Sequence, residues 1–221
     1  MEFASIIQKI AVFAIPLIFA ITLHEAAHAF AARYFGDNTA YMLGRMTLNP
    51  VKHIDPIWTI AVPLLLVLTS SPFIFGAAKP VPVNFGALRQ PKRDMIWVAL
   101  AGPCANLAMM IGWAMVGKVA IMAGAESGSA GPLEYLAMVA GAGIFVNALL
   151  MVFNMFPLLP LDGGRVIAGL LPNKMAYTYS RLEPYGMFIL IALLLTGVFD
   201  RFMTPLVDIS LKAVYSLIGI S

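Results

Sequence analysis

Long apolar stretches alternate with short polar breaks along the chain. Apolar residues dominate six stretches, at about 6–35, 57–76, 94–119, 133–156, 185–199 and 203–220. An α-helix needs roughly 20 apolar residues to cross a bilayer, and several of these stretches approach that length. The pattern predicts an all-α polytopic membrane protein with about five transmembrane helices.

Three segments do not fit a simple crossing helix. Prolines and serines divide 57–76 into halves of about ten residues, each reaching only about 15 Å as a helix, which predicts a re-entrant segment. Residues 40–56 predict a short β-hairpin, at 41–48, followed by a loop. In 79–85, the alternation of residue types together with the prolines predicts an extended edge segment. The hairpin and this edge are expected near the cytoplasmic face. A helix break is predicted at "FPLLPLDGG", followed by a short helix to Leu171.

The composition supports a membrane location. Of the 221 residues, 61% are hydrophobic and 11% are charged, whereas soluble domains carry about 25% charged residues. A single cysteine, Cys104, excludes an intrachain disulfide framework. The net charge of +3 requires no nucleic acid, because cytoplasmic loops of membrane proteins retain Lys and Arg.

The stretch "ITLHEAAHAF" places His24, Glu25 and His28 inside the first apolar segment. Residues four apart share one face of a helix, so the two imidazoles can bind one tetrahedral Zn²⁺, with Glu25 beside it as a base. The alternative is a pair of buried histidines bonded to their neighbours. Ionisable residues at membrane depth usually serve function, which favours the metal site.

A catalytic zinc needs a third protein ligand and an open position for water. Asp162, in "FNMFPLLPLDGGRV", is the candidate, because prolines and glycines break the backbone around it. Broken backbone at membrane depth occurs where it is buried or lines a wet cavity. The alternative is an ordinary loop in which Asp162 caps the next helix.

The two motifs lie late in the first and fourth long segments, so these two helices must run in the same direction to meet. That topology requires 57–76 to leave and return on one face. It also places most cations on one side, in agreement with the positive-inside bias. The cations on the motif side are Arg33, Arg45, Lys52, Lys79, Arg89, Lys92, Arg93, Arg165, Lys174 and Arg181, against Lys9, Lys118 and Arg201 on the other.

With these motifs the chain resembles the site-2 protease family, the M50-type intramembrane zinc metalloproteases. Further matches are "TLNPVKHIDP", "AKPVPVN", "AGPCAN" and "NALLMVFNMFPLLPLDGG", which together cover roughly 20–171. The form resembled is the minimal one, without a PDZ domain or an extra leading helix. The resemblance implies one Zn²⁺ per chain, held by His24, His28 and Asp162, with Glu25 as the general base. It also implies cleavage of single-span transmembrane substrates in regulated intramembrane proteolysis.

Four other polar residues each have a functional and a structural interpretation. Asn154 precedes the broken segment by one turn and is a candidate substrate or oxyanion contact, with interhelical hydrogen bonding as the alternative. For Asn106 and Asn147, interhelical hydrogen bonding is the favoured interpretation. His53, in "HIDP", is either a substrate contact or a surface loop residue.

The chain is expected to form one integral-membrane metalloprotease domain over 1–221, with a catalytic core at about 6–171 and C-terminal helices at about 184–220. Its expected location is multi-pass in the cell membrane, with the active site nearer the cytoplasmic face. Two rival functions are an inactive relative that binds transmembrane helices and a metal or proton transporter. A structural zinc site would close with four ligands, commonly cysteines. Neither the substrate nor the oligomeric state follows from the sequence.

Overall fold

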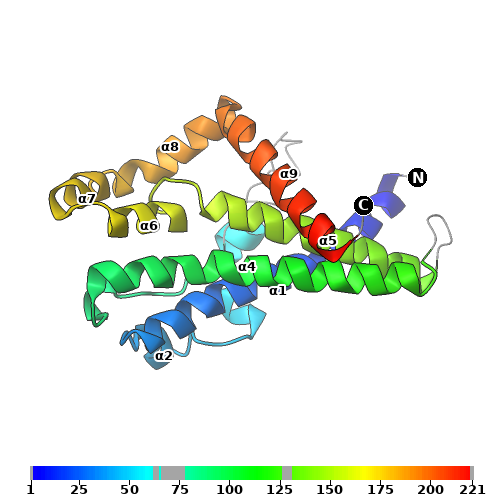
Figure 1. Cartoon of the computed structure of the whole chain (residues 1–221), viewed down its shortest axis with the longest axis horizontal. Coiled ribbons are helices and arrows are strands. Elements are labelled where there is room, and N and C mark those ends of the chain that lie inside the picture. The colour runs from blue at the N-terminus through cyan, green and yellow to red at the C-terminus, as the bar shows by residue number, and fades with distance from the viewer. Residues whose placement is uncertain (1, 62–64, 66–77, 126–130, 220–221) are drawn as a thin grey trace.

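The computed structural model describes residues 2–61, 65, 78–125 and 131–219. Throughout these ranges the regular secondary structure is helical, and they contain no strand. The all-α class predicted from the sequence is therefore confirmed. The body of the molecule consists of the long helices α1 (Glu2–Tyr34), α4 (Pro91–Met122) and α5 (Pro132–Asn154), whose arrangement is shown in Figure 1.

The directions of the long helices bring the two motifs together. In Figure 1, α1 and α5 run the same way and α4 runs opposite to both, as the sequence predicted. Helix α4 packs against both α5 and α1. Small residues allow membrane helices to approach closely, and four alanines in α4 and α5 are at most 1% exposed: Ala114, Ala120, Ala140 and Ala148.

Fewer helices qualify as membrane spans than the five predicted. Three are long and apolar enough to cross a bilayer, namely Ile10–Tyr34, Pro91–Met122 and Pro132–Asn154. The C-terminal pair α8 (Glu183–Leu195) and α9 (Val198–Ile218) qualifies only together and is bent by 83°. Gly197 joins the pair with φ of 69°, a left-handed conformation that glycine adopts without a Cβ clash. The described residues thus give three spans, or up to four.

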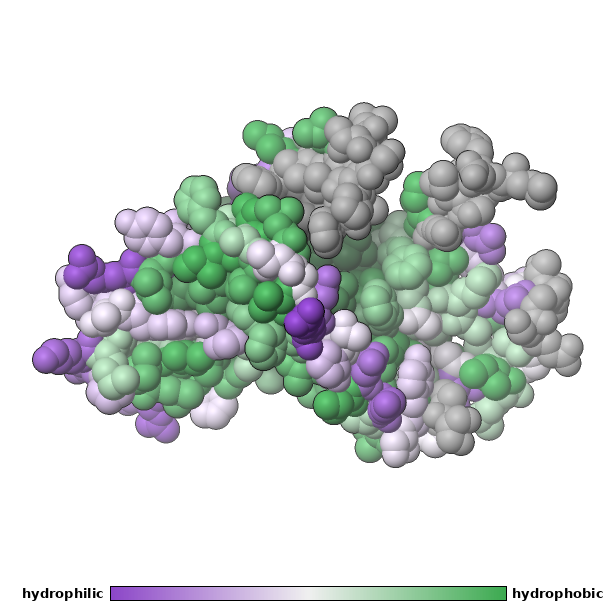
Figure 2. Space-filling model, turned by 90° about the horizontal axis from the view of Figure 1, so that it is seen from above, coloured by the Kyte–Doolittle hydropathy of each residue, from purple (hydrophilic) through white to green (hydrophobic). Residues whose placement is uncertain are grey.

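The surface agrees with a membrane-embedded body. Figure 2 shows hydrophobic side chains over much of the visible face, with many hydrophilic ones at the left end. In Figure 1 that end holds the beginning of α4 and the short helix α7 (Asn173–Ser180), which the sequence did not predict.

The helix is interrupted after α5, and a new helix, α6 (Asp162–Leu170), begins after the break, as predicted. Two glycines follow Asp162 because the backbone packs closely there. A Cβ at Gly163 would overlap the Met155 carbonyl, and one at Gly164 would overlap the backbone at Leu159. These contacts fold the first turn of α6 against the broken segment and so place the Asp162 side chain.

The predicted β-hairpin at 41–48 is wrong. The structure has α2 (Thr39–Met42) there, followed by turns and the 3₁₀ helix η1 (Pro50–His53). The Asp37 carboxylate accepts hydrogen bonds from the Thr39 N–H at 2.9 Å and from the Thr39 hydroxyl at 2.5 Å. An Asp that bonds two residues ahead favours a turn, and here the turn leads directly into a helix.

The segment at 79–85 is extended as far as Asn84, but it forms no ladder. The 3₁₀ helix η3 (Phe85–Ala87) begins directly after it. Prolines at positions 80 and 82 remove two of the N–H groups that pairing would require. Of the predicted re-entrant segment 57–76, residues 62–64 and 66–76 lie outside the described residues. Its beginning forms the π-helix η2 (Pro56–Ala61).

Candidate metal centre

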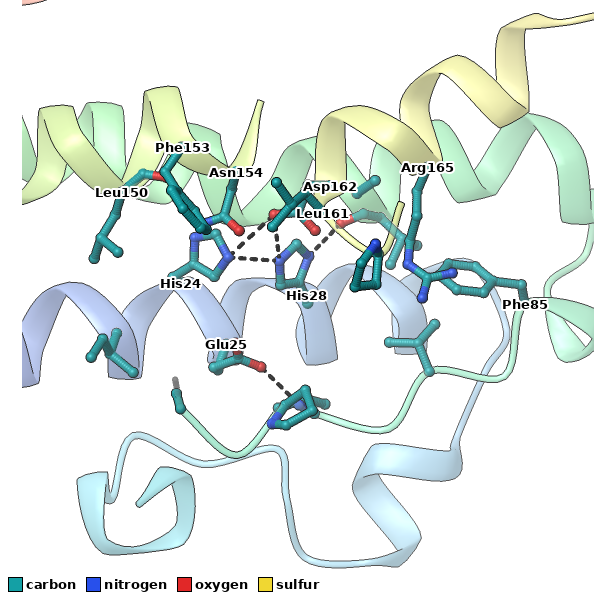
Figure 3. Close-up of a pocket in the computed structure, with 18 of the residues that line it drawn as sticks. His24, Glu25, His28, Phe85, Leu150, Phe153, Asn154, Leu161, Asp162 and Arg165 are labelled. Atoms are coloured by element: carbon teal, nitrogen blue, oxygen red, sulfur yellow. Dashed lines mark hydrogen bonds and ion pairs between the residues drawn. The ribbon is translucent and has the colours of Figure 1, made fainter. Parts of the chain in front are cut away.

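Three potential ligands converge between α1 and α6. The Nε2 atoms of His24 and His28 lie 3.0 Å apart, and each lies 3.3 Å from Asp162 Oδ2. Figure 3 shows the two rings on one face of α1, turned toward the carboxylate. The histidines are 6% and 9% exposed. Asp162 Oδ2 is buried and has no hydrogen-bond partner among the described residues.

This donor set fits a zinc ion. Two imidazole nitrogens and one carboxylate oxygen are the ligand types found in three-ligand catalytic zinc sites. One ligand atom from each of the three side chains falls within 4.8 Å of the other two. A cation held between them would satisfy the two facing nitrogens and the buried oxygen together.

Both rings are held in the tautomer that metal binding requires. His28 Nδ1 lies 2.7 Å from the Val98 carbonyl oxygen, which can only accept, so Nδ1 carries the proton. His24 Nδ1 lies 2.6 Å from Asn106 Oδ1 and donates to it. In its neutral form each ring thereby presents the Nε2 lone pair to the centre, the arrangement that outer partners impose on metal-bound histidines.

A chain of amides fixes the side chain of Asn106. Its Nδ2 donates to Asn147 Oδ1 at 2.9 Å, and Asn147 Nδ2 donates to the Gly143 carbonyl at 2.8 Å. Both asparagines are fully buried. The interhelical hydrogen bonds predicted for them are present, and the sequence analysis missed that one of these bonds reaches His24. The motif "AGPCAN", which contains Asn106, was the available signal.

The same motif supplies a close approach between helices. A Cβ at Gly102 of α4 would overlap the rings of both His24 and His28. The absence of a side chain there lets the imidazoles lie against α4, within reach of Val98 and Asn106. Gly102 is thus a site residue that the sequence analysis did not single out.

Glu25 is next to His24 in the sequence, but its carboxylate points away from the three candidate ligands. Its Oε2 accepts a hydrogen bond from the Val81 N–H at 2.7 Å. Figure 3 shows the carboxylate on the opposite side of α1 from Asp162, facing the extended segment that contains Val81. Glu25 and the three ligand residues line one cavity of about 590 Å³.

Most of that cavity is apolar. Side chains of α5, α8 and the extended segment line it together with the metal ligands, and Arg165 lines it from α6. Arg165 also forms an ion pair with Glu183, at 3.0 Å, and lies over the Phe85 ring. The cavity therefore offers a mostly apolar lining next to the three candidate ligands.

Asn154 and His53, the two other candidate residues, have different surroundings. Asn154 lines the cavity, and its Nδ2 donates to the Leu150 carbonyl at 2.9 Å within α5. His53 is 1% exposed, and its Nε2 donates to the Thr47 carbonyl at 2.9 Å. It does not belong to the residues that line the cavity. The structure brings Asn154 to the site. His53 ends the 3₁₀ helix η1 outside the cavity lining, and because its side chain is buried the interpretation as a surface loop residue is wrong, whereas a substrate role stays a prediction.

Similarity to known proteins covers almost the whole chain. It is 35% identical over 210 residues to a Bacillus subtilis protein named "Putative zinc metalloprotease YwhC". The aligned region covers 92% of this chain and 89% of that protein. A Mycolicibacterium smegmatis protein named "Putative zinc metalloprotease Rip2" is 28% identical over 195 residues, 86% of this chain and 69% of that protein. The Mycobacterium tuberculosis Rip2 is 29% identical over 175 residues, 79% of this chain and 61% of that protein.

No protein-family model and no solved structure matches the chain. The apolar helices and the His-His-Asp cluster define a membrane-embedded protein with a candidate zinc site. The identity and coverage shared with YwhC show that the chain belongs to the zinc metalloprotease family of YwhC and Rip2.

Proposed function

We propose that the chain is an intramembrane zinc metalloendopeptidase of the site-2 protease type. It hydrolyses peptide bonds within transmembrane segments of single-span membrane proteins, in regulated intramembrane proteolysis. The observation that carries this proposal is the convergence of His24, His28 and Asp162 in an apolar cavity that Glu25 also lines. The positive-inside bias supports a position nearer the cytoplasmic face of the cell membrane.

In this proposal His24, His28 and Asp162 hold one Zn²⁺. A bound zinc ion supplies a Lewis acid and lowers the pKa of water from about 15.7 toward 7. Asn106 and the Val98 carbonyl keep the two Nε2 atoms unprotonated and directed at the site. Burial of both rings keeps competing water away from them.

Glu25 is the general base. Its carboxylate takes a proton from the attacking water and returns it to the leaving amine, which typically contributes 10²- to 10⁴-fold to the rate. Asn154 is placed in the last turn of α5 beside the cavity, where its amide can donate to a substrate carbonyl in exchange for the bond to Leu150.

The substrate enters as an extended segment. A peptide bond inside a helix is shielded by its own turn, so the scissile part must unwind before water attacks. The apolar lining of the cavity replaces the lipid that such a segment leaves.

The test is cleavage of a model single-span substrate by purified protein, with bound zinc measured in parallel. Glu25→Gln should keep its zinc and lose cleavage by about 10²- to 10⁴-fold, whereas Asp162→Ala should lose both. Wild-type rates in Glu25→Gln would exclude Glu25 as the base. If the wild-type protein binds zinc and several single-span membrane proteins but cuts none of them, the chain is a relative that only binds transmembrane helices.

A further inference from the structure

The extended segment 78–84, called the strap below, has few backbone donors. Its sequence is "AKPVPVN", and Pro80 and Pro82 carry no N–H group. Between the two prolines the only backbone donor is Val81. Side chains of the strap line the cavity beside the metal centre, among them Val81 and Val83.

Both ends of the strap are anchored. At the first end, the Lys79 N–H donates to the His53 carbonyl at 2.9 Å, and the Arg45 guanidinium donates to the Lys79 carbonyl at 2.9 Å. At the second end, the Asn84 N–H donates to Asp37 Oδ2 at 2.7 Å. Asp37 is 1% exposed and also bonds the start of α2. The strap is thereby fixed to the loops that follow α1.

The middle of the strap holds the base. The Val81 N–H donates to Glu25 Oε2 at 2.7 Å, a bond to a charged acceptor and so a strong one. Val81 itself is buried, 7% exposed, and packs with Ala29 and Ala40. Since the donor is anchored, the Glu25 side chain is the partner free to rotate. In Figure 3 it is turned away from the side of α1 that faces Asp162.

We propose that the Val81 N–H is a positioning group that holds Glu25 in a resting orientation, and that an extended substrate releases the base by taking over this N–H. The inference rests on the proposed function. A peptide that lies along the strap can hydrogen-bond to its backbone at Val81, because the prolines on both sides leave this residue as the donor nearest the base. A substrate carbonyl at that N–H displaces the carboxylate, which then turns toward the metal centre. Base and substrate are thus brought together by one exchange of hydrogen bonds.

Hydrogen exchange tests the resting contact without any cleavage. In zinc-loaded protein without substrate, a proteolytic peptide covering 78–84 should contain one slowly exchanging amide that disappears in Val81→Pro, which assigns it. Glu25→Ala should speed exchange of this amide by about tenfold or more, since it removes a charged acceptor. Glu25→Gln, whose amide oxygen still accepts, should retain most of the protection. Unchanged exchange in Glu25→Ala would overturn the contact.

Kinetics test the release. Val81→Pro removes the N–H that the substrate is to pair with, so KM should rise by about tenfold, while kcat stays within about threefold because the base is already free. Val81→Ala keeps the N–H and should leave KM near the wild-type value. A fall of about tenfold in kcat at unchanged KM would contradict the proposal, because the N–H would then support the base during the reaction.

The two arms separate failure of this inference from failure of the proposed function. A wild-type protein that cleaves no single-span substrate refutes the protease, and with it release by substrate, while the exchange arm still decides whether the strap holds Glu25. If Val81→Pro loses its zinc or its fold, the comparison of Glu25→Ala with Glu25→Gln alone supports or overturns the resting contact.

Discussion

At the scale of single residues, Asn147 should control zinc binding although it hydrogen-bonds to none of the three candidate ligands. Its Oδ1 holds the Asn106 amide so that Asn106 Oδ1 faces His24 Nδ1. In Asn147→Leu the Asn106 amide can flip and present Nδ2, which favours the His24 tautomer that is protonated at Nε2. We expect zinc affinity to fall by about 10- to 100-fold, measured by competition with a chelator.

Thr196→Val is the matched control for Asn147→Leu. It removes hydrogen bonds that Thr196 makes only within its own helix, to Ala192 and Leu193, so zinc affinity should stay unchanged. Equal affinities in the two variants would show that the amide chain does not govern the His24 ring.

The cluster of candidate zinc ligands could be predicted because each member stands in a recognisable sequence pattern. His24 and His28 are one helical turn apart, and Asp162 is the acid of the later broken segment. The role of Asn106 could not be predicted in this way, because its partner is 82 positions away on another helix. The same holds for Val81, whose bond to Glu25 depends on how the strap returns to α1.

At the scale of the elements, the packing of α1 on α4 depends on Gly102. An alanine there would place its Cβ against the rings of both His24 and His28, and overpacking of this kind typically costs about 1–3 kcal/mol. We expect Gly102→Ala to lower bound zinc by at least about tenfold, because the displaced rings no longer direct their nitrogens at the metal. The temperature of unfolding should fall as well. Gly112→Ala, on the same helix with nothing within 4 Å of the added Cβ, should keep its zinc. If Gly102→Ala binds zinc as wild type does, the helices can separate without moving the rings.

Helices and their boundaries followed closely from the sequence, whereas the loop elements did not. The predicted segments at 94–119 and 133–156 became α4 and α5 with ends within four residues of the prediction. The prediction of a β-hairpin failed because the Asp37 side chain accepts a hydrogen bond from the Thr39 N–H, which starts a helical turn. The separate helices predicted at 185–199 and 203–220 became one bent pair, since a left-handed Gly197 turns the chain sharply.

At the scale of the whole molecule, the arrangement predicts which side of the membrane each end occupies. Figure 1 shows α7 and the last turn of α4 at opposite ends. The α7 end carries Lys174 and Arg181, and cations gather on the cytoplasmic side. Tyr177 and Met122 are 71% and 78% exposed at these ends, so cysteines placed there report each side separately.

In a Cys104→Ala background, Tyr177→Cys should react with a membrane-impermeant thiol reagent only from the cytoplasmic side, and Met122→Cys only from the other. The expected labelling follows because the three long helices run parallel or antiparallel through the body, so its two ends cannot share one side of the bilayer. Labelling of both positions from one side would mean that the body does not cross the membrane. Reversed labelling would place the metal centre nearer the outer face, and substrates would then have to unwind from that side.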